Sequence, residues 1–181
     1  MAWVLKKTVV LVGMMGAGKT AVGTALAARL GVAMRDCDAE LVAAANMSIA
    51  EIFERDGEAF FRERESEVLA RLLDGAPSIL STGGGAFLRE RNREVISARG
   101  VSVWLSASLD LLWARVRHKD TRPLLRTADP HATLRRLCRE REPFYALADL
   151  RVEADPAYSI EDMAGRVLDA LDARKDVLAR A

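Results

Sequence analysis

A buried strand followed at once by a glycine-rich turn constrains the fold of this chain more than any other feature. Residues 8–12, TVVLV, form a β-branched apolar run, which is typical of a strand buried on both faces of a parallel sheet. The next eight residues, GMMGAGKT, fit the pattern G-x-x-x-x-G-K-[ST], and apolar residues then recur at helical spacing until Gly31. This order predicts a phosphate-binding loop between a strand and a helix.

The residues of the loop suit phosphate binding for separate physical reasons. Glycines let the backbone curl so that its N–H groups point at an anion, and the start of the following helix adds partial positive charge. Lys19 supplies a charge for the β- and γ-phosphates, and the hydroxyl of Thr20 is a candidate ligand for Mg²⁺. The predicted nucleotide-binding residues of this segment are Gly13, Gly16, Ala17, Gly18, Lys19, Thr20 and Ala21.

The same stretch has one competing interpretation, as a secretion signal. Two lysines precede its apolar run, as they do in export signals. Gly13 interrupts residues 9–15, however, Gly16 and Gly18 follow, and Lys19 adds a charge before any small-residue cleavage site is reached. Cys37 and Cys138 stand far apart, with no zinc-binding spacing. We therefore expect a cytoplasmic protein with reduced cysteines.

The composition permits a single domain and gives no general attraction to polyanions. The chain has 181 residues, enough for one domain with a substantial core. Its 27 Lys and Arg against 26 Asp and Glu leave a net charge of +1, so we expect no binding to nucleic acid or to anionic membranes. No apolar run approaches the roughly 20 residues of a membrane-spanning helix. We expect one domain over residues 1–181, and a monomer.

Strand-like and helix-like segments alternate along the rest of the chain. Further strands are expected at 33–38, 78–81, 101–105 and 150–153, and helices at about 39–73 (broken near 46–47 and 56–57), 89–99, up to 117, 131–147 and 160–171. The alternation predicts an α/β fold with three layers, a five-stranded parallel sheet with helices on both faces. The polar stretch 117–130 is predicted to be a mobile lid, and residues 172–181 a frayed tail.

A second group of unusual residues falls where a ligand of such a sheet binds, beyond the carboxyl ends of the strands. Asp36 and Asp38 alternate at the end of a predicted strand, so one is expected to face the water shell of a metal ion and the other an acceptor. The glycines at 83–85 offer backbone N–H groups at close range. Arg62 and Arg141 together would form a clamp for a carboxylate.

A phosphate-binding loop alone indicates only a nucleoside triphosphatase or a kinase. The chain has no NKxD-type sequence for reading guanine, which argues against a GTPase. It also lacks the size and accessory domains of a motor or transporter ATPase. A kinase with a small acceptor remains.

Taken together, these segments resemble shikimate kinases. The matching segments are GMMGAGKT at 13–20, D-x-D at 36–38, DGE-x-x-FR at 56–62, TGGG at 82–85, RPLL at 122–125 and REPFY at 141–145. They occur in the family's order and cover about residues 8–153. The resemblance implies a nucleoside monophosphate kinase-like fold. It also implies ATP-dependent phosphorylation of the 3-hydroxyl of shikimate, which yields shikimate 3-phosphate and ADP in the route to aromatic amino acids.

The resemblance also implies roles for residues in the acceptor site. Asp38 holds the ring hydroxyls and is a candidate acceptor for the proton of the attacking hydroxyl. Arg62 and Arg141 bind the shikimate carboxylate, and Glu65 orients Arg62. The implied pocket is lined by Gly83, Gly84 and Gly85.

On the donor side, the resemblance implies roles outside the loop as well. Thr20 and Asp36 belong to the Mg²⁺ shell. Arg115 stacks on adenine. Arg122 lies in the lid over the phosphates and acts in catalysis together with Lys19.

Two alternatives stay open from the residues alone. One is a kinase of the same architecture for another small acid, such as gluconate; the triple glycine and the paired arginines argue against it. The other is a non-catalytic nucleotide-binding module on a decayed kinase. It is disfavoured because the residues that chemistry would need are all present, namely Lys19, Asp38, Arg62, Arg122 and Arg141.

Overall fold

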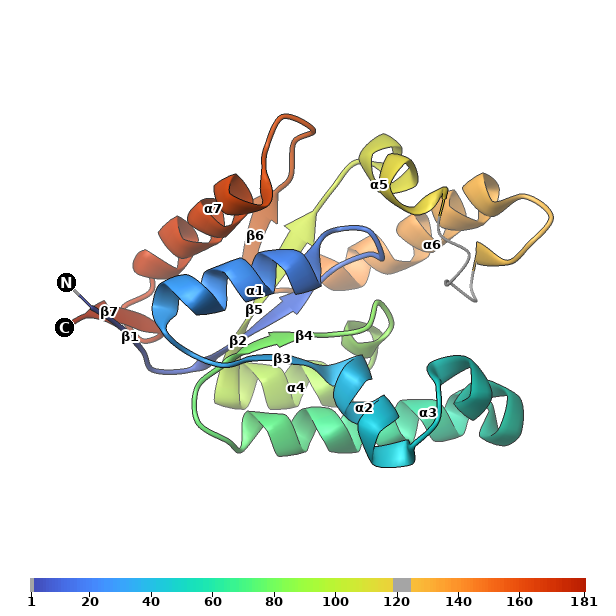
Figure 1. Ribbon diagram of the computed structural model, residues 1–181, viewed down its shortest axis with the longest axis horizontal. Helices are drawn as coiled ribbons and strands as arrows, with labels where there is room; N and C mark the ends of the chain where they lie inside the picture. The colour runs from blue at the N-terminus through green and yellow to red at the C-terminus, as the bar shows by residue number, and fades with distance from the viewer. Residues whose placement is uncertain (1, 119–124) are drawn as a thin grey trace.

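Five parallel strands organise the chain (Figure 1). The computed structural model describes residues 2–118 and 125–181. In spatial order the strands are β3 (Met34–Asp36), β4 (Ile79–Ser81), β2 (Thr8–Val12), β5 (Gly100–Ser106) and β6 (Leu150–Glu153). Every residue of β2 and β5 is buried, which suits the apolar run of β2 and the Val, Trp and Leu side chains of β5. The predicted α/β fold with a five-stranded parallel sheet is confirmed.

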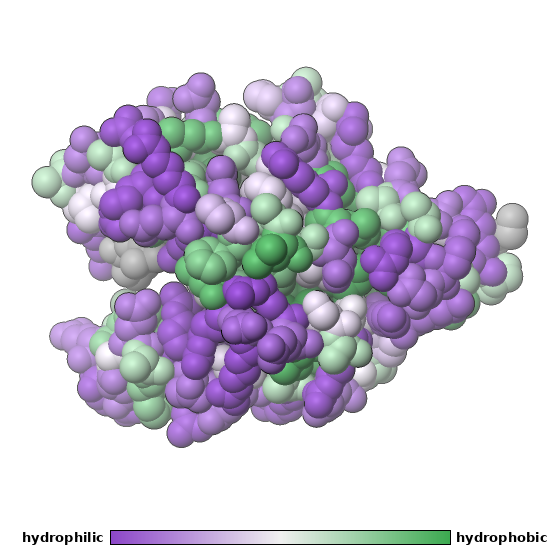
Figure 2. Space-filling model, turned by 180° about the vertical axis from the view of Figure 1, so that it is seen from behind, coloured by the Kyte–Doolittle hydropathy of each residue, from purple (hydrophilic) through white to green (hydrophobic). Residues whose placement is uncertain are grey.

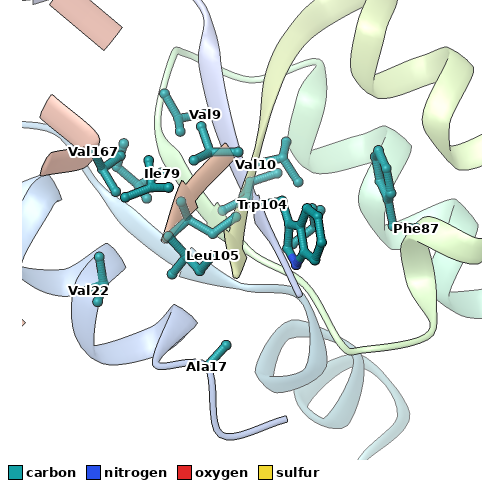
Figure 3. Close-up of a cluster of buried hydrophobic side chains, with 14 of the residues drawn as sticks. Val9, Val10, Ala17, Val22, Ile79, Phe87, Trp104, Leu105 and Val167 are labelled. Carbon is teal, nitrogen blue, oxygen red and sulfur yellow. The ribbon is translucent and has the colours of Figure 1, made fainter. Parts of the chain in front are cut away.

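Helices cover both faces of the sheet. They are α1 (Lys19–Leu30), α2 (Cys37–Ala45), α3 (Ile49–Leu73), α4 (Glu90–Arg99), α5 (Leu109–Val116), α6 (Pro130–Tyr145) and α7 (Ile160–Asp172), with a 3₁₀ turn η1 (Ala86–Leu88). The blue α1 and the red α7 pack side by side on one face, and α3 and α4 lie on the other (Figure 1). Figure 3 shows Val22 and Val167 on one side of the strands and Trp104 on the other.

Serine side chains mark the start of three helices, and a glycine marks a fourth. Ser48, Ser108 and Ser159 accept hydrogen bonds from N–H groups in the first turns of α3, α5 and α7. The residue before α1 is Gly18, which has a left-handed backbone and no side chain to offer as a cap. The first N–H groups of α1 are therefore left for a ligand at the end of β2.

The break expected within residues 39–73 is present at both predicted places. Asn46 ends α2 with a left-handed backbone (φ 53°). Gly57 interrupts α3 with φ 85° and ψ 170°, which a non-glycine residue rarely adopts. The segment therefore folds as α2 and a kinked α3, which pack on each other, with α2 beside the edge strand β3.

The predicted strand at 33–38 is wrong at its end. β3 stops at Asp36, and Asp38 lies in the first turn of α2. Oδ1 of Asp36 accepts hydrogen bonds from the N–H groups of Asp38 (2.9 Å) and Ala39 (3.1 Å), so this side chain starts the helix. The argument that placed the two carboxylates on opposite faces of a strand therefore does not apply. It was also wrong in itself, because residues two apart in a strand share a face.

The tail is also different from the prediction of a frayed end. Residues 178–180 form β7 (Leu178–Arg180), which pairs antiparallel with β1 (Trp3–Leu5) where the two termini meet (Figure 1). Val177 and Leu178 are fully buried, and Lys7 forms an ion pair with Asp176 at 3.2 Å. A short apolar pair at the end of a charged segment gave too little periodicity to indicate a strand.

Residues 119–124 of the predicted lid lie outside the described residues, and with them Arg122. Where the structure describes the chain, no helix has the length and apolar character needed to cross a bilayer.

Candidate functional site

A cavity of about 550 Å³ lies over the carboxyl ends of β2, β3 and β4. Its walls come from the phosphate-binding loop, the first turn of α2, the turn after β4, α5 and the loop before α7. Seen from behind, the molecule is deeply notched between the lobe that carries α5 and α6 and the lobe that carries α3 (Figure 2). The cavity is where ligands of open parallel sheets bind.

The loop from Gly13 to Gly18 has the curled backbone that its glycines predict. Gly13, Gly16 and Gly18 have φ of 144°, 85° and 91°. A Cβ on Gly13 would lie 2.8 Å from the carbonyl oxygen of Leu105, and one on Gly16 would lie 2.7 Å from Cγ1 of Val116. Both backbone conformation and space therefore require glycine at these two positions.

Lys19 is held at the mouth of this loop. Its side chain is buried, and Nζ donates to the carbonyl oxygens of Gly13 (2.7 Å) and Met14 (2.9 Å). These bonds place a positive charge where the curled amides and the start of α1 also concentrate positive potential. The arrangement can bind a polyphosphate.

Three side-chain oxygens meet beside the loop, at the ends of β3 and β4. Thr20 Oγ1 donates to Oδ2 of Asp36 at 3.2 Å and lies 3.5 Å from Oγ of Ser81. Oxygen ligands of this kind fit Mg²⁺, which keeps several waters and usually takes only one or two protein ligands. Within residues 2–118 and 125–181, no cluster of three His, Cys, Asp or Glu side chains has a metal-binding arrangement.

The triple glycine brings together side chains from three distant segments. A Cβ on Gly85 would overlap the guanidinium of Arg62. One on Gly84 would lie 2.7 Å from Nη1 of Arg141, and one on Gly83 would lie 3.0 Å from Oδ1 of Asp38. Because the turn has no side chains, two guanidiniums and a carboxylate reach its backbone directly. The sequence-predicted acceptor residues therefore lie in one place, next to the phosphate-binding loop.

A buried carboxylate holds the first of these guanidiniums. Nη1 of Arg62 donates to Oε1 of Glu65 at 2.8 Å, and the Glu65 side chain is 1% exposed. Burial raises the pKa of Glu65, although the charge of Arg62 acts in the opposite direction. Oε2 of Glu65 would lie 3.3 Å from a Cβ on Gly83, on the same side as Asp38. Two carboxylates and two guanidiniums therefore surround the turn.

The second guanidinium, that of Arg141, stands beside a tyrosine to which the sequence analysis assigned no role. Tyr145 is fully buried, and its hydroxyl donates to the carbonyl oxygen of Gly84. Burial raises the pKa of Tyr145 to about 12, against the influence of Arg141. The sequence did offer one signal for this position: Tyr145 follows Arg141 by four residues, and residues four apart in a helix share a face.

Arg115 and the loop before α7 complete the far side of the cavity. Nη1 of Arg115 donates to the carbonyl oxygen of Gly16 at 2.9 Å. Tyr158, Ser159, Ile160 and Met163 line the same cavity but were not assigned to the site from the sequence. No short motif marks them; their place depends on how α7 packs on α1.

Comparison with known proteins agrees with this geometry. Residues 15–172 match the family model described as shikimate kinase. A shikimate kinase from Ruegeria pomeroyi is 70% identical over 96% of this chain and 89% of its own length. The structure of a shikimate kinase from Acinetobacter baumannii in complex with shikimate has a TM-score of 0.89 at 37% identity, covering 93% of this chain and 94% of that chain.

A more distant structural neighbour shows that a shared fold does not by itself indicate the family. A gluconokinase structure from Sinorhizobium meliloti 1021 covers 94% of this chain and 98% of its own, but with a TM-score of 0.59 and 18% identity. That likeness shows only a shared fold. The family model and the close relative show more: the chain belongs to the shikimate kinase family.

Proposed function

We propose that this chain transfers the γ-phosphoryl group of ATP to the 3-hydroxyl of shikimate. The cavity over β2 would be the donor site and the cluster at 83–85 the acceptor site. One observation carries the proposal: Arg62, Arg141 and Asp38 converge on the triple glycine, and a Cβ on Gly84 would lie only 3.8 Å from the carbonyl oxygen of Gly13 in the phosphate-binding loop. The two sites are therefore adjacent, as direct transfer requires.

On the donor side, the backbone amides of the loop and the ammonium of Lys19 bind the phosphates. Thr20 and Asp36 would hold Mg²⁺, which would neutralise phosphate charge when bound. Arg115 stands where it could stack on the base, and Arg122, which lies outside the described residues, keeps its predicted role in a lid over the phosphates. The protein's role here is to align the reacting groups and to neutralise phosphate charge, because phosphoryl transfer requires little covalent catalysis.

On the acceptor side, the guanidiniums of Arg62 and Arg141 bind the shikimate carboxylate, and Glu65 fixes the first of them. Asp38 orients the ring hydroxyls and accepts the proton of the attacking hydroxyl. Its carboxylate faces Gly83, and both residues line the same cavity as Asp36 and Thr20. The acceptor hydroxyl would therefore meet the terminal phosphate within this cavity.

An assay coupled to ADP release, run with shikimate, gluconate and other hydroxy acids, tests the proposal. We expect turnover with shikimate at a rate well above that with any other acid. Turnover with gluconate and none with shikimate would support the rival kinase. Shikimate binding without turnover would support a non-catalytic module.

We also propose that the protein works as a monomer in the cytoplasm. Both cysteines, Cys37 and Cys138, are free and buried, which suits a reducing compartment. Light scattering coupled to size-exclusion chromatography tests the oligomeric state. A mass near 19.8 kDa is expected, and a mass twice as large would contradict the proposal.

A further inference from the structure

Tyr145 lies at the junction of three parts of the site. From the end of α6, its hydroxyl donates to the carbonyl oxygen of Gly84 in the acceptor turn. The same oxygen lies 3.9 Å from Sδ of Met14 in the phosphate-binding loop. The backbone carbonyl of Met14 in turn accepts a hydrogen bond from Lys19. A single phenol therefore touches the acceptor turn and the residue that holds the donor-site lysine.

Tyr145 also stands next to the carboxylate clamp. It follows Arg141 by one helical turn on the same face of α6. A Cβ on Gly84 would lie 2.7 Å from Nη1 of Arg141 and 3.6 Å from the Tyr145 hydroxyl, so both side chains meet the same short piece of backbone. Movement of Gly84 would therefore disturb the surface against which the Arg141 guanidinium is placed.

The hydroxyl, rather than the ring, makes this link. The ring is fully buried and packs 6.0 Å, centroid to centroid, from that of Trp104, a task that phenylalanine could also perform. The hydroxyl donates to the carbonyl oxygen of the half-buried Gly84, which phenylalanine could not do. Burial keeps the phenol protonated, and so able to donate, throughout the neutral range.

We infer that Tyr145 is a positioning residue of the acceptor site. Its hydroxyl fixes the carbonyl of Gly84 and thereby sets the place of the triple-glycine turn relative to Arg141 and to the phosphate-binding loop. The inference rests on the proposed function, because it assumes that shikimate binds at this turn. It concerns the affinity for the acceptor, since the donor site is held by the loop's own backbone.

Titration calorimetry on Tyr145→Phe, with shikimate and with ADP as separate ligands, tests the inference. One neutral hydrogen bond contributes about 1 kcal/mol, so we expect the Kd for shikimate to rise about fivefold. The Kd for ADP should stay within about twofold. Steady-state kinetics should show the same division, with a raised KM for shikimate and an unchanged KM for ATP.

Phe144→Leu is the matched control. Phe144 precedes Tyr145 in α6 but is 38% exposed, with Arg93 over its ring. Its replacement should leave both affinities unchanged. Unchanged shikimate affinity in Tyr145→Phe, or equal weakening for shikimate and ADP, would overturn the inference. Failure of the wild-type protein to bind shikimate would instead overturn the proposed function, and the inference with it.

Discussion

The donor and acceptor sites touch each other but are built in different ways. The donor site is one continuous segment, in which glycines with positive φ expose backbone amides and the start of α1 adds its dipole. The acceptor site is made of side chains from α2, α3 and α6 that meet only because the turn at 83–85 has none of its own. Backbone thus recognises phosphate on one side, and guanidinium and carboxylate groups recognise a small acid on the other.

This difference predicts which substitutions should impair each site. Most substitutions in the donor loop act on backbone shape, and the loop contributes one charged side chain, Lys19, to the phosphates. The acceptor site depends on several charged side chains that hold one another, as Glu65 holds Arg62. We therefore expect donor changes to lower kcat and acceptor changes to raise the KM for shikimate.

The largest effect should come from Lys19→Ala. Loss of the ammonium removes stabilisation of charge that develops during transfer, so kcat should fall about 10³-fold. Titration with shikimate should show an unchanged Kd, because the acceptor cluster does not include this residue. Lys7→Ala removes an exposed ammonium that pairs with Asp176 and serves as the control. A near-normal kcat in Lys19→Ala would contradict the expectation that changes in the donor site lower kcat.

The next effect should come from Arg62→Ala. A guanidinium bound to a carboxylate makes charge-assisted hydrogen bonds, and their loss should raise the KM for shikimate about 100-fold. The KM for ATP should stay near its wild-type value. Arg64→Ala removes an exposed arginine of α3 that pairs with Glu67, and it should change neither value. An equal rise in both KM values for Arg62→Ala would mean that the two sites are not separable.

A smaller effect on the same guanidinium is expected from Gly85→Ala. The added methyl would overlap the Arg62 guanidinium, which must move. Because that side chain can partly adjust, the KM for shikimate should rise about 30-fold, less than on its removal. Gly75→Ala is the control, since its Cβ would meet only the carbonyl oxygen of Leu72 at an ordinary 3.5 Å. An unchanged KM for shikimate in Gly85→Ala would show that the acceptor turn can accommodate an added methyl group.

The same difference explains how much could be predicted from the sequence. The strand, loop and helix around Lys19 were predictable because their physics is local. The acceptor segments could be found only as separate motifs, and the fold was needed to bring Arg62 and Arg141 to one turn. Their convergence is a result of tertiary structure, and no spacing in the chain encodes it.

The sequence predictions that were wrong or missing also have local physical reasons. The strand was expected to continue to Asp38, but the carboxylate of Asp36 caps α2, so the strand ends at Asp36. Residues 178–180 gained strand structure from β1, which lies at the other end of the chain. Tyr145 ends the REPFY segment, but that segment does not distinguish a ligand-facing tyrosine from a core tyrosine. The wall at 158–163 carries no motif.

Among these changes to the two sites, Glu65→Gln should have a smaller effect than Lys19→Ala, Arg62→Ala or Gly85→Ala, and its sharper readout is the pH dependence of stability. The amide still meets Arg62 but without charge, so the KM for shikimate should rise about tenfold. Burial raises the pKa of Glu65 above its ordinary 4.5. The folded state therefore holds the proton more tightly than the unfolded state. The wild-type protein loses stability as the pH rises from the unfolded pKa of Glu65 to its higher folded pKa. The glutamine variant has no such loss, so its Tm relative to wild type should increase from pH 4.5 to pH 8.

Glu63→Gln supplies the opposite sign as a control for that measurement. Hydrogen bonds from Arg89 and Arg91 lower the pKa of Glu63, so its carboxylate contributes stability above its unfolded pKa and loses it as the pH falls. The Tm of this variant relative to wild type should therefore decrease as the pH rises to the ordinary 4.5 of Glu63, and change little above it. Parallel trends in the two variants would mean that Glu65 is not penalised by burial. The acceptor site would then owe its geometry to Arg62 and Arg141 without a buried anchor, and the contrast with the backbone-built donor site would be weaker.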